Sequence, residues 1–220
     1  MKKLGSFFFL TVVVAACSND GTKSATTSDS ANMTETHAAT PPENTTTNTT
    51  MGNVNLMDMM NKNMQEMKAM QSTGNPDNDF AAMMKTHHMG ATEMAQAEVA
   101  QGTDAEMKAM AQKMIDAQQQ EISELNSFLS GHAAHEGGNA FHKEVMAQMN
   151  DMKMDMNHSG SFDKQFAQMM IPHHQSAIDM SKAYLKSGGH EEKLKTMANK
   201  IIADQQKEIG ELQAWLDKNK

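Results

Sequence analysis

The chain has 220 residues, a formal net charge of −8 and 25 methionines, while Phe, Trp and Tyr together make up only 5% of it. Any hydrophobic core must therefore be built mainly from Met, Ala, Leu and Ile. All 19 basic residues are Lys. An acidic chain without Arg, the side chain best suited to phosphates and guanine edges, lacks the charge pattern of a nucleic-acid-binding protein, so no nucleic acid partner is expected.

The first 16 residues have the pattern of a signal peptide. Lys2 and Lys3 precede an apolar stretch that is too short to span a bilayer. The stretch ends in Val-Ala-Ala-Cys, which resembles the lipobox of bacterial lipoproteins and implies cleavage before Cys17 and lipidation of its thiol. An ordinary signal peptide with a chance cysteine is the alternative. The pattern predicts a lipid-anchored protein of the cell envelope, on the periplasmic side or at the outer membrane of a double-membrane bacterium.

Residues 17–52 are predicted to form a disordered tether. They are rich in Ser, Thr and Asn and contain too few apolar residues to build a core. As a random coil this segment would span roughly 30 Å, enough to hold a domain away from lipid headgroups. The folded domain is therefore expected in residues 53–220.

An internal repeat is the most informative feature of this domain. The segment FAAMMKTHH, which begins at Phe80, returns as FAQMMIPHH from Phe166, and MIDAQQQEISEL returns further along as IIADQQKEIGEL. The spacing is 86 to 87 residues. It divides the domain into two repeats, at about 56–130 and 141–217.

Each repeat is predicted to form two long helices and no strands, because apolar residues recur at helical spacing and never alternate over a sustained stretch. Asn75 followed by Pro76 marks a helix start, and Thr103 with Glu106 fits a capping box at the start of the next helix. Four long helices make an antiparallel bundle, so the predicted fold class is all-α. A shorter Met-rich helix is expected before each long pair, at about 56–71 and 140–156.

Each repeat carries two adjacent histidines one helical turn after two methionines. On a helical wheel the first histidine shares the apolar face with the methionines, and the second lies at its edge. One imidazole of each pair is therefore expected to point into the bundle, while the other can reach the rim. Because residues three and four apart on a helix are neighbours, these side chains are predicted to bind metal. The candidate ligands are Met83, Met84, His87, His88, Met169, Met170, His173 and His174.

The donor types predict a soft metal ion. Thioether sulfur and imidazole together suit Cu(I), and Ag(I) is chemically similar. Outside the cytoplasm, Met supplies a sulfur ligand that cannot form a disulfide. Binding is expected to weaken as the pH falls through about 6, because a protonated imidazole does not coordinate metal. The alternative is that methionines fill the core and each inner histidine is a packing residue.

A second, weaker metal site is a hypothesis for the connection between the repeats, where methionines alternate with polar residues. In an extended chain, residues two apart lie on one side at a separation of roughly 6.6 Å, so they could wrap one Cu(I). Continuation of the preceding Met-rich helix is the alternative, and the pattern slightly favours it. The hypothetical ligands are Met152, Met154, Met156 and His158.

Four polar residues fall on the apolar arcs of the second long helices. Buried polar groups need partners. These side chains either accept the free N–H of a ligand histidine and fix its tautomer, or form a polar layer that sets the register of the helices. The sequence leaves both interpretations open for Gln118, Glu121, Gln205 and Glu208.

The doubled pattern Phe-x-x-Met-Met-x-x-His-His-x-x-Ala-x-x-Met, each followed by Gln-Gln-x-Glu-Ile-x-Glu-Leu, resembles domain-of-unknown-function family 305 over about residues 78–217. The resemblance implies a ferritin-like helical bundle and a role in copper binding or tolerance outside the cytoplasm. The family's Ile-Pro-His-His is intact from Ile171 to His174, whereas the first repeat has Lys85-Thr86 in place of Ile-Pro. Pro172 removes a helix hydrogen bond and is expected to kink its helix.

The expected function is therefore to sequester, buffer or hand over copper, without catalysis, with a copper-transfer protein as a further partner. A metal-free helical interaction module is one alternative. A ferritin-like metal oxidase is the other, but that chemistry uses Glu-x-x-His pairs. This chain has Met84-x-x-His87 and Met170-x-x-His173 instead.

Overall fold

The computed structural model describes residues 55–133, 137–151 and 160–220. Over these ranges the chain forms helices and no strands, which confirms the predicted all-α class. The helices are α1 (Leu56–Ala69), α2 (Pro76–Gln101), α3 (Ala105–Gly131), α4 (Ala140–Asp151), α5 (Phe162–Lys186) and α6 (Glu192–Lys218). The predicted signal peptide, tether and lipidated Cys17 lie outside the described residues, as does the hypothetical site at residues 152–158.

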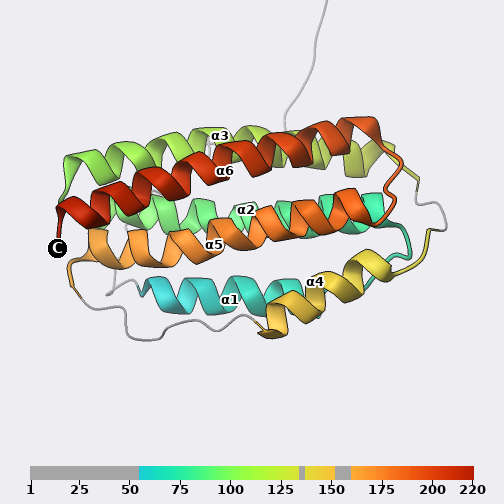
Figure 1. The fold of residues 1–220 in the computed structure, drawn as a ribbon, viewed down its shortest axis with the longest axis horizontal. Helices are drawn as coiled ribbons and strands as arrows, with labels where there is room; N and C mark the ends of the chain where they lie inside the picture. Colours follow the sequence, from blue (N-terminus) through green and yellow to red (C-terminus); the bar gives the residue numbers. More distant parts are fainter. Residues whose placement is uncertain (1–54, 134–136, 152–159) are drawn as a thin grey trace, which may run out of the picture. The chain divides into compact units, whose positions relative to one another are not determined.

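The helices form two equivalent sets of three, one for each sequence repeat (Figure 1). The long helices α2 and α5 pack against each other in the middle layer. On one side α2 packs against α3 and α5 against α6, and on the other side α1 and α4 contact both middle helices. Both faces of α2 and of α5 are therefore covered. This determines where the two histidines of each motif point.

The helix starts follow from local hydrogen bonding, with one difference from the sequence analysis. The side chain of Asn75 accepts hydrogen bonds from the backbone of Asp77 and Asn78, so the predicted start of α2 is confirmed. The predicted capping box at the start of α3 is wrong. Asp104 is the N-cap residue there, while the hydroxyl of Thr103 donates to Asp163 in the other repeat.

Two aspartates tie the repeats together in a reciprocal way. Asp77, in the first turn of α2, accepts hydrogen bonds from the backbone of the loop between α5 and α6. Asp163, in the first turn of α5, accepts them from the backbone of the loop between α2 and α3. Asp77 and Asp163 are 86 residues apart and occupy equivalent positions in the two repeats. The aspartate of each repeat therefore binds the interhelical loop of the other repeat. Buried carboxylates with several N–H donors hold the two middle helices at a fixed register.

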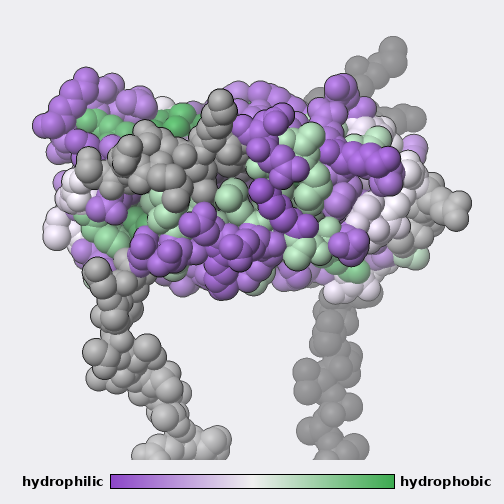
Figure 2. All heavy atoms as spheres, turned by 90° about the horizontal axis from the view of Figure 1, so that it is seen from below, coloured by the Kyte–Doolittle hydropathy of each residue, from purple (hydrophilic) through white to green (hydrophobic). Residues whose placement is uncertain are grey.

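The core is rich in methionine, as the composition requires, with one aromatic cluster. Tyr184 stacks on Phe80 with ring centroids 4.2 Å apart, and Phe141 of α4 meets Phe80 edge-on at 6.1 Å. These contacts fasten α4 to the middle layer. Seen from the side of α1 and α4, the surface is mostly hydrophilic with small apolar areas (Figure 2). None of the described helices has both the length and the apolar character of a membrane-spanning segment.

Candidate metal-binding pocket

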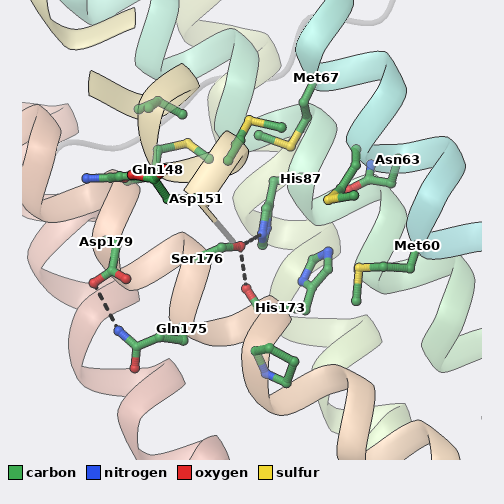
Figure 3. A pocket seen from close by; sticks show the side chains of 15 residues that line it. Met60, Asn63, Met67, His87, Gln148, Asp151, His173, Gln175, Ser176 and Asp179 are labelled. Carbon is green, nitrogen blue, oxygen red and sulfur yellow. Dashed lines mark hydrogen bonds between the residues drawn. The ribbon is translucent and has the colours of Figure 1, made fainter. Parts of the chain in front are cut away.

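A pocket of about 400 Å³ lies between the short helices α1 and α4 and the long helices α2 and α5. Helix α1 supplies three of its methionines, α4 one and α5 one, and the two middle helices each supply one histidine (Figure 3). Thioether and imidazole groups from both repeats therefore line a single space. These side chains are Met60, Met64, Met67, Met149, Met180, His87 and His173.

The histidines of the pocket face each other across the contact between the repeats. The rings of His87 and His173 have centroids 3.8 Å apart and an interplanar angle of 39°. Each residue is only 3% exposed. Because α2 and α5 are equivalent helices that pack together, the same residue of each repeat meets its copy. The sequence repeat did not reveal that the two motifs contribute to one pocket.

Most ring nitrogens of this pair have no hydrogen-bond partner in the described part of the chain. The Nε2 atom of His87 lies 2.6 Å from the hydroxyl oxygen of Ser176. Within the described part of the chain, Nδ1 of His87 and both nitrogens of His173 are buried without a hydrogen-bond partner. Buried polar atoms are normally paired, so unpaired nitrogens beside a pocket are candidate ligands for a bound ion.

Burial keeps these imidazoles neutral. Burial first, and then the charges that His173 and His88 would carry, hold the pKa of His87 well below its ordinary value of 6.5. Burial, followed by His174 and His88, lowers the pKa of His173 in the same way. A neutral ring keeps a lone pair for metal at neutral pH. We therefore expect protons to displace metal from this pair only below the pH of about 6 expected from the sequence.

The second histidine of each motif does not reach the rim of the bundle, contrary to the prediction from the helical wheel. His88 and His174 are both completely buried. They point away from the pocket, because adjacent helical residues are about 100° apart. The Nε2 atom of His88 lies 2.8 Å from a carboxylate oxygen of Glu121 on α3. The Nε2 atom of His174 lies 3.0 Å from a carboxylate oxygen of Glu208 on α6.

These contacts show which of the four polar residues on α3 and α6 pair with a histidine. Glu121 and Glu208 pair with histidine, although the ring N–H groups are not well aligned with the carboxylate oxygens. Burial opposes ionisation of Glu121, but His88 and Lys200 outweigh it and keep its pKa below the ordinary value. The histidines involved are those outside the pocket. The carboxylates therefore pair with His88 and His174 and not with the two histidines that line the pocket.

The four methionines predicted from the two motifs do not line the pocket. All four are at least 98% buried and belong to the hydrophobic core. The helical wheel placed them on the apolar face, but that face is broad enough to include both the pocket and the core beneath it. The residues concerned are Met83, Met84, Met169 and Met170.

The methionines that do line the pocket come mainly from α1, with one from α4 and one from α5. The sequence contained a weak signal for them, because Met64 and Met67 match Met149 and Met152 at an offset of 85 residues, one less than the offset between the two His-His motifs. Periodicity could not show where these short helices pack. Over the described ranges, no group of three or more His, Cys, Asp or Glu residues could hold a metal ion. Beside His87 and His173, the pocket offers thioethers as soft donors.

The family described as "Domain of unknown function (DUF305)" matches the chain twice, over residues 20–129 and 130–216. The chain belongs to this family. The two matches agree with the two repeats inferred from the internal spacing. The crystal structure of a DUF305 fragment from Deinococcus radiodurans, at 20% identity and a TM-score of 0.50, covers 65% of this chain and 96% of that fragment. It shows the shared fold.

Two further solved structures carry metal. CopM in the Cu(I)-bound form is 26% identical, with a TM-score of 0.50 over 67% of this chain and 98% of CopM. CopM in the Ag-bound form obtained by soaking is also 26% identical, with a TM-score of 0.50 over 68% and 98% of the two chains. A curated relative, the uncharacterized protein L153 of Acanthamoeba polyphaga mimivirus, is 43% identical over 58 residues. That match spans 26% of this chain and 38% of the relative.

Proposed function

We propose that this protein binds Cu(I) in the pocket between α1, α4 and the α2–α5 pair. The observation that carries the proposal is the facing pair His87 and His173 in a pocket lined by five methionines. Three of the four ring nitrogens of this pair are buried without a hydrogen-bond partner among residues 55–133, 137–151 and 160–220. Similarity to CopM, which has been solved with Cu(I) and with Ag, supports the same choice of metal.

The choice of Cu(I) follows from the ligand chemistry. Thioether sulfur is soft and uncharged, so it favours a soft monovalent ion over hard ions that need carboxylates. Burial strengthens this preference, since a low-dielectric pocket disfavours an ion of higher charge unless acidic ligands balance it. Two carboxylates line the pocket, Asp151 and Asp179, and Gln175 donates a hydrogen bond of 2.9 Å to Asp179. Ag(I) satisfies the same requirements and would compete.

We further propose that the protein holds copper without catalysing a reaction. In this proposal Cys17 carries a lipid anchor, and residues 17–52 place the copper-binding domain in the space outside the cytoplasmic membrane. Buffering and transfer then use the same pocket. A copper-transfer protein would approach from the side of α1 and α4, because these helices form one wall of the pocket.

A Cu(I) competition titration tests the proposal. The purified protein is titrated against a chromophoric Cu(I) chelator without oxygen, beside the double variant His87→Ala/His173→Ala. We expect the double variant to bind Cu(I) at least about a hundredfold more weakly, since loss of ligand or supporting groups commonly costs 10–100-fold in metal affinity. The exposed His190 provides the control, because His190→Ala removes an imidazole outside the pocket. Unchanged affinity in a folded double variant, judged by circular dichroism, would exclude this pocket.

A further inference from the structure

The two repeats differ at one position beside the facing histidines. The offset of 86 residues that relates His87 to His173 also relates Gly90 to Ser176. Ser176 lies on α5 and lines the pocket, whereas Gly90 has no side chain. The pair of histidines is therefore symmetric in backbone position and asymmetric in hydrogen bonding.

The hydrogen bonds of Ser176 determine which nitrogen of His87 carries a proton. Its Oγ atom lies 2.7 Å from the carbonyl oxygen of His173 and 2.6 Å from Nε2 of His87 (Figure 3). Two oxygen atoms at 2.7 Å need a proton between them, so the hydroxyl donates to the carbonyl. A hydroxyl has only one proton, and its oxygen must then accept from an N–H at Nε2. In a neutral imidazole this leaves the lone pair on Nδ1.

The first repeat cannot supply the equivalent hydroxyl to His173. A Cβ atom at position 90 would collide with the side chain of Asn63 on α1. That side chain is fixed, because its Nδ2 atom donates to the carbonyl of Thr86 at 2.8 Å. Both nitrogens of His173 consequently remain without a hydrogen-bond partner among the described residues. His173 can present either nitrogen, whereas His87 can present only one.

We propose that Ser176 is a positioning residue that holds His87 as the Nε2-protonated tautomer, so that His87 binds metal through Nδ1 while His173 stays unconstrained. The inference rests on the proposed function for its metal-binding part. The tautomer itself is a property of the metal-free protein. Ser176 would touch no metal and would act only through the imidazole that it orients.

Nitrogen NMR of the metal-free protein, labelled with [15N]histidine at neutral pH, tests the tautomer. Signals of His87 are assigned by their loss in His87→Gln. We expect an Nε2–H and an unprotonated Nδ1 in the wild type. In Ser176→Ala, the Nε2 proton should exchange with water about tenfold faster, because its hydrogen bond is lost, and the second tautomer should become visible.

Two variants separate a specific effect from a general one. Ser176→Thr keeps the hydroxyl and should restore the slow exchange. Ser181→Ala removes another buried hydroxyl of α5, one for which the described residues provide no hydrogen-bond partner, so it should leave His87 unchanged. A wild-type His87 protonated on Nδ1 would overturn the proposal. So would a Ser176→Ala spectrum with the wild-type tautomer and the wild-type exchange rate.

Addition of Cu(I) then tests the two proposals separately. The expected result is a shift of Nδ1 of His87 and of one nitrogen of His173, with the Nε2 proton of His87 retained. Loss of that proton, together with a shift of Nε2, would mean that Cu(I) binds on the side of Ser176 and would overturn the positioning role. Cu(I) that leaves both rings unchanged would overturn the proposed function, while the tautomer of the metal-free protein would still be decided by the first experiment.

Discussion

The two repeats have the same three helices in the same order, but they differ where each contacts the other. At the pocket, Ser176 of the second repeat corresponds to Gly90 of the first. At the interhelical loops, Tyr184 corresponds to Glu98 at the same offset of 86 residues. The backbone of a duplicated fold is maintained by helix packing, whereas a side chain at the contact between the copies can change on one side only. A nearly symmetric scaffold can therefore hold two chemically different half-sites.

The pair of Tyr184 and Glu98 shows this most clearly. The hydroxyl of Tyr184 donates to Asp77, the aspartate that binds the loop between α5 and α6. Glu98 is completely buried beside Asp163, the equivalent aspartate. Two ionised carboxylates could form no hydrogen bond there. Burial first, and then Asp163, raise the pKa of Glu98 to about 8, so Glu98 is protonated at neutral pH and can donate as the tyrosine does.

The largest effect on stability is expected when Gly90 is replaced by serine, the residue at the equivalent position of the second repeat. In Gly90→Ser, the new side chain must displace Asn63, which loses its hydrogen bond to Thr86. Overpacking of this kind costs about 1–3 kcal/mol, so the free energy of unfolding in urea should fall by that amount. In an Asn63→Ala background the added cost should be much smaller. An equal cost in both backgrounds would show that the contact between α1 and α2 does not distinguish the repeats.

Several of these features were predictable from sequence and others were not, for physical reasons. Helix positions and the Asn75 cap depend on residues near in sequence, and both were predicted. The capping box failed because Asp163, sixty residues away, binds the hydroxyl of Thr103. The wheel correctly separated His87 from His88 by direction. It could not show that α3 covers the side of α2 on which His88 lies, since periodicity describes one helix and not the packing of several.

The pocket illustrates the same limit. Its histidines were among the predicted ligands, but most of its methionines lie on α1 and α4, whose positions depend on tertiary contacts. One such contact is the hydrogen bond from Asn63 to the backbone of Thr86. The facing arrangement of His87 and His173 also depends on how α2 meets α5. A repeat in the sequence shows that two motifs are equivalent, but it does not show that they are adjacent.

A second effect on stability, one that depends on pH, is expected at Glu98 beside Asp163. Because the folded-state pKa of Glu98 lies above its ordinary value of 4.5, its contribution to stability is fully present below pH 4.5 and is lost as the pH rises toward about 8. Glu98→Gln imitates the protonated acid and does not titrate. The stability of the wild type relative to Glu98→Gln should therefore fall across this window.

Tyr184→Phe is the matched variant in the other repeat. Burial, and then the hydrogen bond to Asp77, raise the pKa of Tyr184 far above this range, so the hydroxyl stays protonated throughout. Its removal should lower stability by about 1 kcal/mol at every pH from 5 to 8. Urea unfolding of the wild type and both variants at several pH values measures the difference. A stability difference between the wild type and Glu98→Gln that does not vary with pH would contradict a protonated Glu98.

The smallest effect is expected for the pH dependence of Cu(I) binding at His87 and His173, where the two repeats have the same residue. Burial lowers the pKa of both His87 and His173 well below 6.5, so neither ring takes up a proton between pH 7 and pH 6. Protons compete with Cu(I) only when they bind the free ligand, so the affinity should change less than about twofold over this interval and decline at lower pH. The free energy of unfolding of the metal-free protein should also fall as the pH falls below 6.5. The unfolded chain binds protons below pH 6.5, whereas the folded rings do not. Competition titrations from pH 7 to pH 5 test the point, and a decline in affinity centred at pH 6.5 would show that the ligand histidines are solvated rather than buried.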